Sequence, residues 1–247
     1  MRIAMSITVI ALSVSMARAD EKAAEAAFQK AVAHAAKREH DKAVEAFTES
    51  IKADGNTPLV FDRRGDSYLK LGKFSEAIAD FDVYLKANPK LEPEHWRRGI
   101  AYYYAGKHKE GVKQFETHKT VNPQDVENAV WHYLCNVKVI GKEKAAKELI
   151  DVTKDPRVPM AEIQKLFAGK LKAEDVMAAA NKVDEKSEAG KEARFYGHLY
   201  VALWYESEGN DKKVVEHLTP AVEKYVISHY MWDVAKVHLA WTKGKTK

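Results

Sequence analysis

One stretch of this chain occurs twice in close succession. Residues 63–89 read RRGDSYLKLGKFSEAIADFDVYLKANP, and residues 97–123 read RRGIAYYYAGKHKEGVKQFETHKTVNP. The two copies are identical at ten positions, far more than a chance alignment gives. The offset from Arg63 to Arg97 defines a 34-residue period, which is typical of a pair of helices that stacks on its neighbours. The repeat therefore predicts an all-α solenoid.

The matched positions predict two antiparallel helices in each copy. Glycine lies inside the first helix, where it costs up to about 1 kcal/mol relative to alanine and is tolerated if a neighbouring helix approaches closely. Glycine also ends that helix, and proline ends the second helix because it lacks an amide donor. The expected structural positions are Gly65, Tyr68, Gly72, Ala77, Phe81 and Pro89 in the first copy, and Gly99, Tyr102, Gly106, Gly111, Phe115 and Pro123 in the second.

Weaker copies extend the pattern in both directions. Ala43 and Phe47 stand one full period before Ala77 and Phe81, which predicts an earlier repeat. A final helix is expected to cap the stack, because a terminal repeat has no neighbour to cover it. We expect about four to five repeats, arranged as TPR-like hairpins over 20–125 (24–57, 58–91 and 92–125), a divergent helical segment over 126–190, and a last repeat with a capping helix over 191–247.

These repeats resemble the tetratricopeptide repeat (TPR) superfamily, whose unit is a helix–turn–helix hairpin. Within that superfamily, residues 95–150 are similar to the NlpI-type periplasmic lipoproteins, and a weaker likeness extends over 24–243. The resemblance implies an envelope adaptor, often a homodimer, that brings partners such as peptidoglycan hydrolases to a protease. Members of that family are anchored by a lipid on a cysteine at the cleavage site, and this sequence has no cysteine there.

The N-terminus has the pattern of a secretory signal peptide. Arg2 precedes an apolar run over residues 3–16, and the small residues Ala17 and Ala19 suit a cleavage site before Asp20. The apolar run is shorter than the roughly 20 residues that cross a bilayer. We expect residues 1–19 to be removed and the protein to be exported, periplasmic or secreted, and soluble without stable membrane insertion. The alternative is an uncleaved N-terminal anchor.

Charge and cysteine content argue against two classes of function. Removing Arg2 and Arg18 lowers the formal net charge from +4 to +2, and both signs alternate along the chain, so no basic stripe for nucleic acid is present. Cys135 is the single cysteine and has no partner for an internal disulfide. Its place in an apolar helical stretch predicts a small buried side chain rather than a reactive thiol.

One tripeptide suggests a different function. Arg64-Gly65-Asp66 is the sequence that cell-adhesion receptors bind when it lies at an exposed turn. The repeat places this tripeptide inside a helix, where Gly65 serves the packing of two helices. We therefore expect no role in adhesion.

Stacked hairpins of this kind curve, and the first helix of each repeat lines the concave face. Trp96, Tyr103 and Tyr104 would form an aromatic wall there, which is the composition enriched at binding hot spots, unless residues 154–190 fold back and bury it. Fixed offsets from the mid-helix glycines give the predicted groove residues, which are Asp62, Asp66, Leu69, Lys70, Trp96, Arg97, Ile100, Tyr103, Tyr104, Val130, Leu134 and Lys138.

The sequence contains no Gly-rich phosphate loop, nucleophile elbow or zinc-protease signature. It predicts a non-catalytic adaptor without metal or cofactor, which binds other proteins or peptides in a concave groove. One rival is a metal-dependent or enzymatic regulator built on His229, Asp233 and His238. Another is a structural subunit that uses its convex face.

Overall fold

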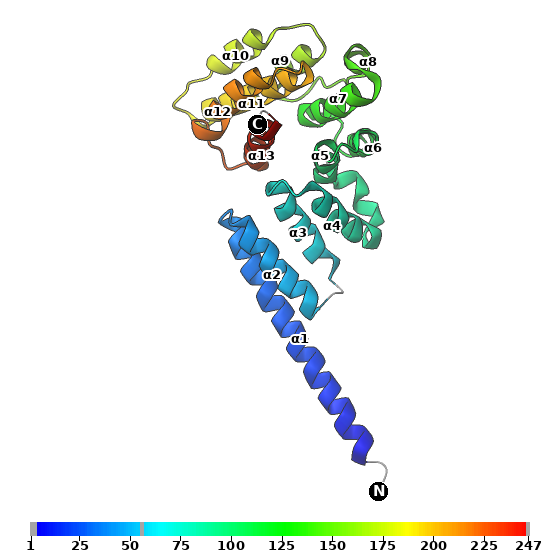
Figure 1. Cartoon of the computed structure of the whole chain (residues 1–247). Coiled ribbons are helices and arrows are strands. Elements are labelled where there is room, and N and C mark those ends of the chain that lie inside the picture. Colours follow the sequence, from blue (N-terminus) through cyan, green and yellow to red (C-terminus); the bar gives the residue numbers. More distant parts are fainter. Residues whose placement is uncertain (1–3, 55–56, 246–247) are drawn as a thin grey trace. The chain divides into compact units, whose positions relative to one another are not determined.

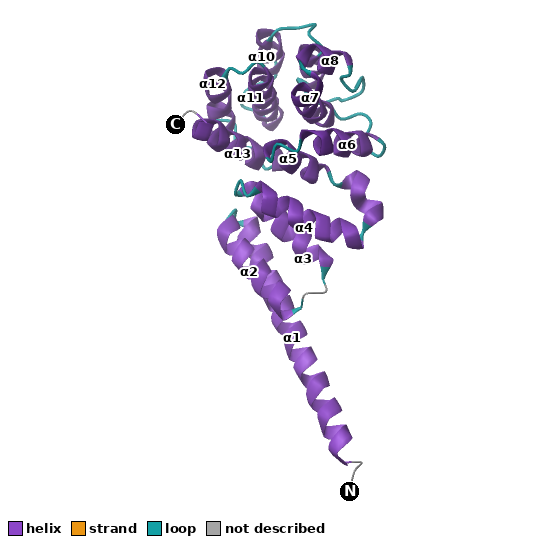
Figure 2. Ribbon diagram, turned by 45° about the vertical axis from the view of Figure 1, so that its right-hand side comes forward, coloured by secondary structure: helices purple, strands orange, loops and turns teal. Residues whose placement is uncertain are grey.

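The computed structural model describes the backbone of residues 4–54 and 57–245, and the side chains of residues 20–54 and 57–244. Within this described part every regular element is a helix, drawn purple in Figure 2, and none is a strand. The predicted all-α helical repeat fold is thus confirmed. The chain divides into two compact units, Met1–Pro89 and Lys90–Lys247, which are described in turn.

The helices of the first unit each pack against the next one along the chain. Ala43 and Phe47, which lie on one helix face, join Ala31 and Val60 in the core of this unit. Phe28 packs against that core, with its ring centroid 5.8 Å from that of Phe47. The helices, labelled in Figure 1, are α1 (Ala4–Ala36), α2 (His40–Ala53), α3 (Pro58–Lys70) and α4 (Phe74–Ala87).

The first helix, α1, continues through the position where the sequence predicts signal cleavage. Arg2 and the side chains of Ala17 and Ala19 lie outside the described part of the structure. None of the helices in the described residues is both long enough and apolar enough to cross a membrane. Cleavage after Ala19 stays a prediction.

A close contact between a glycine and a phenyl ring recurs in the two matched hairpins. A Cβ atom added at Gly65 would lie 2.8 Å from Cε1 of Phe81, and one added at Gly99 would lie 2.6 Å from Cζ of Phe115. Real Cβ atoms do not approach other atoms this closely, so any larger residue would push the ring away. Glycine inside the first helix therefore lets the phenylalanine of the second helix pack directly on its backbone.

The second arginine of each RRG sequence joins the two helices of its hairpin. Arg64 makes two hydrogen bonds of 2.8 Å to the carboxylate of Asp80, and Arg98 donates to the side chain of Gln114 at 2.8 Å. Arg64 lies inside α3, and its side chain is 16% exposed. The prediction that the Arg-Gly-Asp tripeptide is helical is confirmed, because the tripeptide lies within α3. The contacts of Arg64 also tie it to the neighbouring helix.

The second unit begins with the third predicted hairpin, and its last hairpin precedes a C-terminal helix. The divergent segment supplies the helices between them, and the last hairpin packs against the C-terminal helix. The elements are η1 (Pro89–Glu94, a short 3-10 helix at the boundary), α5 (Trp96–Tyr104), α6 (His108–Lys119), α7 (Val126–Ile140), α8 (Lys142–Lys147), α9 (Met160–Phe167), α10 (Ala173–Asn181), α11 (Glu188–Ser207), α12 (Asp211–Glu223) and α13 (Tyr230–Lys245).

Helix α7 is the centre of the second unit. It packs against α5, α6, α8, α9 and α11, and most of its side chains are buried as a result. Cys135 on α7 is fully buried, and a Cβ atom added at Gly111 of α6 would lie 2.6 Å from its Sγ atom. Burial raises the pKa of this thiol well above its usual value. The prediction of a small buried side chain at Cys135 is confirmed.

Candidate functional site

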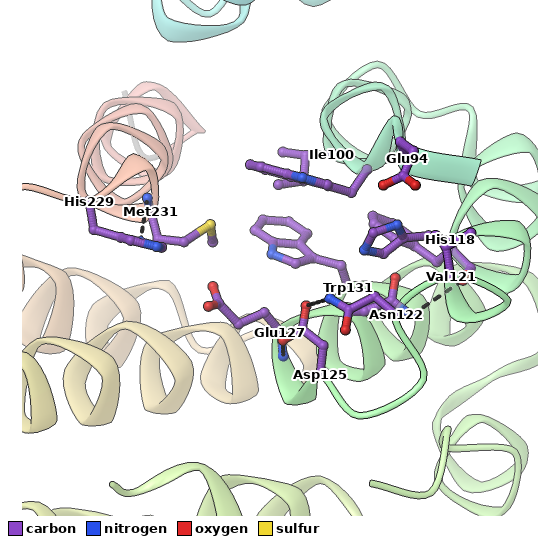
Figure 3. Close-up of a pocket in the computed structure, with 13 residues that line it drawn as sticks. Glu94, Ile100, His118, Val121, Asn122, Asp125, Glu127, Trp131, His229 and Met231 are labelled. Carbon is purple, nitrogen blue, oxygen red and sulfur yellow. Dashed lines mark hydrogen bonds between the residues drawn. The ribbon is translucent and has the colours of Figure 1, made fainter. Parts of the chain in front are cut away.

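A pocket of about 440 Å³ lies in the second unit, where the third hairpin meets α7 and the segment around the start of α13 (Figure 3). Pockets of this size hold small ligands or a single long side chain. The apolar residues that line it are Trp96, Ile100, Phe115, Val121, Trp131 and Met231. Its polar lining consists of Glu94, His118, Asn122, Asp125, Glu127, Asn128 and His229.

The indole of Trp131 forms part of the pocket lining, as Figure 3 shows, and is 2% exposed. Tyr103 and Tyr104 pack against it, with ring centroids 5.6 and 5.9 Å away. Trp96, which stays partly exposed, packs edge-on against Tyr230 of α13 at a centroid distance of 4.8 Å. Two tryptophans from different helices are thereby held in place as walls of the pocket.

Two buried polar atoms of the lining have no hydrogen-bond partner among the described residues, namely Nε1 of Trp131 and Oδ1 of Asn128. The two residues stand three apart on α7 and so share one face of that helix. The amide nitrogen of Asn128 donates to the carbonyl of Phe115 at 3.3 Å. A buried polar group without a partner costs about 1–3 kcal/mol. A ligand that accepts from Trp131 and donates to Asn128 would recover that energy.

Carboxylates give the pocket its charge. Asp125 caps the N-terminus of α7 by accepting from the backbone N–H of Glu127 at 3.1 Å. The Glu127 carboxylate accepts from the hydroxyl of Tyr200 at 2.6 Å, and η1 contributes the exposed Glu94. Within the described part of the chain, no lysine or arginine lines the pocket.

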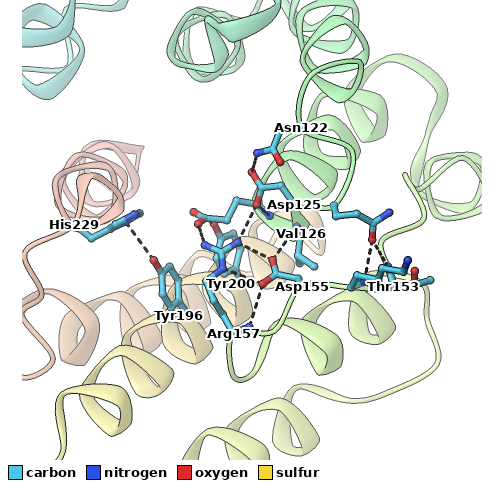
Figure 4. Close-up of polar contacts among 12 residues, drawn as sticks. Asn122, Asp125, Val126, Thr153, Asp155, Arg157, Tyr196, Tyr200 and His229 are labelled. Atoms are coloured by element: carbon cyan, nitrogen blue, oxygen red, sulfur yellow. Dashed lines mark hydrogen bonds and ion pairs between the residues drawn. The ribbon is translucent and has the colours of Figure 1, made fainter.

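One arginine behind the pocket, Arg157, is shared by three carboxylates (Figure 4). Its guanidinium lies 3.0 Å from Asp125 and 2.7 Å from Asp155, and it also pairs with Glu127. Burial raises the pKa of Glu127, and the nearby Asp125 acts in the same direction, while Arg157 and the Tyr200 hydroxyl oppose the rise. Three carboxylates against one guanidinium leave this side of the pocket negatively charged.

The predicted aromatic wall is only partly accessible. Tyr103 and Tyr104 are 2% and 7% exposed, and Trp241 of α13 packs against them with centroids 6.2 and 5.3 Å away. Tyr103 donates to Glu206 at 3.2 Å, and the Tyr104 hydroxyl lies 2.8 Å from Nδ1 of His238. The prediction that these two tyrosines face a free groove is wrong. The C-terminal helix covers them, rather than the divergent middle segment.

The other predicted groove residues are distributed between the core and the surface. Buried side chains occur at Asp62, Leu69, Ile100, Val130 and Leu134. An ion pair of 2.9 Å joins Asp66 and Lys70. The side chain of Arg97 is half-buried, and that of Lys138 is exposed. Asp62, Leu69, Val130 and Leu134 are buried in the core, so the groove prediction is wrong for these four, while Trp96 and Ile100 do line the pocket.

The sequence pattern missed the side of α7 that lines the pocket. The repeat offset was carried past Pro123 and predicted Val130, whereas the pocket is lined by Glu127, Asn128 and Trp131. The repeat breaks after Pro123, so an offset measured in earlier hairpins no longer gives the facing residues. A cap-forming Asp125 followed by polar and aromatic residues at helical spacing was the available signal for this face.

The histidines of the metal hypothesis belong to different contacts. His229 lies 3.3 Å from the Tyr196 hydroxyl and accepts from the backbone N–H of Met231 at 3.3 Å. His238 is buried beside Tyr104. No group of three His, Cys, Asp or Glu in the described part of the chain could hold a metal ion. Both histidines instead help to fix the position of α13.

A family model of the tetratricopeptide repeat matches residues 15–58 and 63–125. This chain contains tetratricopeptide repeats. The matched residues take in most of the three predicted TPR hairpins, and the third of them carries Trp96 and Ile100 of the pocket. TPR units stack into surfaces that bind other proteins.

Among solved structures, a tetratricopeptide repeat protein from Parabacteroides merdae has a similar fold. The TM-score is 0.54 at 16% sequence identity, over 89% of this chain and 84% of that chain. A likeness at this level of identity concerns the fold. No curated protein matches the sequence.

Proposed function

We propose that this TPR protein is a non-catalytic scaffold that binds a partner protein or peptide in the pocket of its second unit. The observation that carries the proposal is the pair of buried groups at Trp131 and Asn128, a donor and an acceptor without partners among the described residues. Protein interiors leave few such groups, and those that occur call for an explanation. A ligand that completes both hydrogen bonds supplies one.

Buried contacts support the tryptophan wall of the pocket in the absence of a partner. Trp131 is fixed by Tyr103 and Tyr104, which are themselves held by Glu206 and His238. A preorganised site loses little conformational entropy on binding, so more of the contact energy appears as affinity. The covered tyrosines thus act as the support of the site rather than as its surface.

The site of action that we propose is the bacterial cell envelope. The support is the signal-like N-terminus, with a basic residue at Arg2 and small residues at Ala17 and Ala19 before the expected cleavage point. The resemblance of residues 95–150 to NlpI-type adaptors points in the same direction. The proposed partners are a protease or a peptidoglycan hydrolase of that compartment.

Affinity capture from an envelope fraction tests the proposed binding site. The wild type is compared with Trp96→Ala/Asn128→Ala, which removes one wall and the unpaired acceptor. Lys147→Ala is the matched control, because Lys147 is exposed on α8 and does not line the pocket. We expect the double variant to lose a partner that the wild type and the control both recover. Equal recovery by all three proteins would show that the pocket is not the binding site.

A further inference from the structure

The chemistry of the pocket indicates which part of a partner enters it. We propose that the pocket binds a lysine or arginine side chain from an extended segment of the partner, an inference that rests on the proposed function. The carboxylates then face the cationic head, the tryptophans face the apolar stem, and the unpaired groups on α7 face the peptide backbone. Each of these three contacts has its own structural ground.

The first ground is charge. The pocket is lined by three carboxylates, those of Glu94, Asp125 and Glu127. The described lining residues include no lysine or arginine. Arg157, which is not part of the lining, pairs with Asp125 and Glu127, but Asp155 shares the same guanidinium, so the charge of these carboxylates is only partly balanced. A cation that enters from the open side gains from this field, whereas a carboxylate would be repelled by it.

The second ground is the apolar wall. Trp96 and Trp131 lie on two different helices of the lining, and Met231 adds a flexible apolar side chain from α13. Lysine and arginine carry apolar stems that pack along such surfaces. Their cationic heads are also attracted to the faces of tryptophan rings. A short polar side chain would leave these walls uncovered.

The third ground is hydrogen bonding. The indole N–H of Trp131 requires an acceptor, and the Oδ1 atom of Asn128 requires a donor. A peptide backbone offers a carbonyl and an N–H close together. A free polyamine has no acceptor for Trp131, so the backbone contact favours a peptide as the source of the basic side chain.

Labelled heptapeptides of glycine, alanine and serine, with one central residue varied, test this inference on the full chain. Fluorescence anisotropy compares arginine and lysine with citrulline, leucine and glutamate at the centre. Citrulline has nearly the shape of arginine without its charge. We expect the arginine and lysine peptides to bind at least about tenfold more tightly than the citrulline peptide, which corresponds to about 1.4 kcal/mol. Added salt should reduce this difference.

Two variants separate the charge contact from the backbone contact. Glu94→Gln changes an exposed side chain, so the fold is retained, and it should weaken the arginine peptide severalfold while leaving the citrulline peptide unchanged. Asn128→Ala should weaken the binding of both peptides by a similar factor, because it removes the side-chain oxygen that accepts from the peptide backbone N–H. Lys147→Ala should change the affinity of neither peptide.

The outcomes distinguish this inference from the proposed function. If the citrulline, leucine or glutamate peptide binds as tightly as the arginine peptide and Asn128→Ala weakens it, the pocket is a binding site but not one for a basic side chain. If the arginine peptide does not bind, the inference fails, and the capture experiment with Trp96→Ala/Asn128→Ala then decides the proposed function on its own.

Discussion

The repeats at 58–91 and 92–125 build the same hairpin and differ in what the first helix presents. The glycine–phenylalanine contact and the cross-hairpin arginine occur in both, one period apart. At two other matched positions, Leu69 and Lys70 of the earlier repeat are replaced by Tyr103 and Tyr104. Lys70 pairs with a carboxylate of its own helix, whereas Tyr104 reaches His238 of α13.

This difference separates two kinds of sequence information. Positions that repeat are those that each hairpin needs for its own packing, whatever its neighbours are. Positions that do not repeat reflect the particular elements around one hairpin. In the later repeat they join α5 to the C-terminal helix and support Trp131 of the pocket. The divergent residues of this repeat therefore hold the pocket lining in place, while the repeated residues build the hairpin.

The largest effects should come from the shared core, and they should be alike in both repeats. Phe81→Ala and Phe115→Ala each remove a phenyl ring that is 0% or 1% exposed. Each should lower the free energy of unfolding by about 3–5 kcal/mol, because a buried cavity is left behind. Urea unfolding followed by circular dichroism measures both variants.

The chain offers a probe and a control for this pair. All five tryptophans lie in the second unit, so tryptophan fluorescence follows that unit alone. The loss of stability caused by Phe115→Ala should therefore appear in unfolding curves followed by tryptophan fluorescence. Val139→Ala, at a position 38% exposed, should change stability by less than about 0.5 kcal/mol. A loss near zero for either phenylalanine would mean that the two hairpins are not built alike.

Intermediate effects should come from the positions that diverge. Tyr104→Phe removes the hydroxyl that lies 2.8 Å from His238 in the buried contact with α13. It should cost about 2 kcal/mol, because a buried polar group of His238 loses this hydrogen bond. Asp66→Asn breaks the 2.9 Å ion pair in the earlier repeat and should cost about 0.5 kcal/mol.

Hydrogen exchange locates the intermediate effect. In Tyr104→Phe the amides of α13 should exchange faster than in the wild type, while those of α11 and α12 change less. Tyr102→Phe is the matched control, because Tyr102 is only half-buried and belongs to the repeated pattern. Equal protection of α13 in wild type and variant would mean that the tyrosine does not hold this helix.

The hairpins could be predicted from the sequence alone because the contacts that build each hairpin lie within one repeat. Gly65 and Phe81 belong to one repeat, and the period displays the pair a second time as Gly99 and Phe115. The helical state of the Arg-Gly-Asp tripeptide followed from the same pattern, and the burial of Cys135 followed from its apolar helical stretch. Contacts that recur leave a visible signal in a single sequence.

The site was harder to predict because its contacts join distant, unrepeated segments. Trp131 of α7 is supported by Tyr103 of α5, and Tyr103 donates to Glu206 of α11, far along the chain. Nothing in a single sequence pairs such positions. Trp96 and Ile100 of the pocket lining keep the offsets of the repeat, whereas Asn128 lies on α7, beyond the repeated pattern.

A further effect, smaller than that of Tyr104→Phe, concerns acid and should be confined to the second unit. His198 of α11 and His217 of α12 lie with their Nδ1 atoms 3.2 Å apart. Burial lowers the pKa of His198 to about 4, and the charge of His217 acts in the same direction. Burial also lowers the pKa of His217. Acidification therefore protonates these histidines in the unfolded chain before it does so in the folded one.

The sign of the effect follows from this difference in proton uptake. The contribution of neutral His198 to the stability of the folded unit is complete above the ordinary histidine pKa of about 6.5. It is lost as the pH falls toward 4. Between pH 7 and pH 5.5 the free energy of unfolding of the second unit should fall by about 1 kcal/mol for His198. Tryptophan fluorescence during urea unfolding at both values measures it. His198→Gln should flatten this dependence, and an unchanged slope would assign the acid sensitivity to other groups.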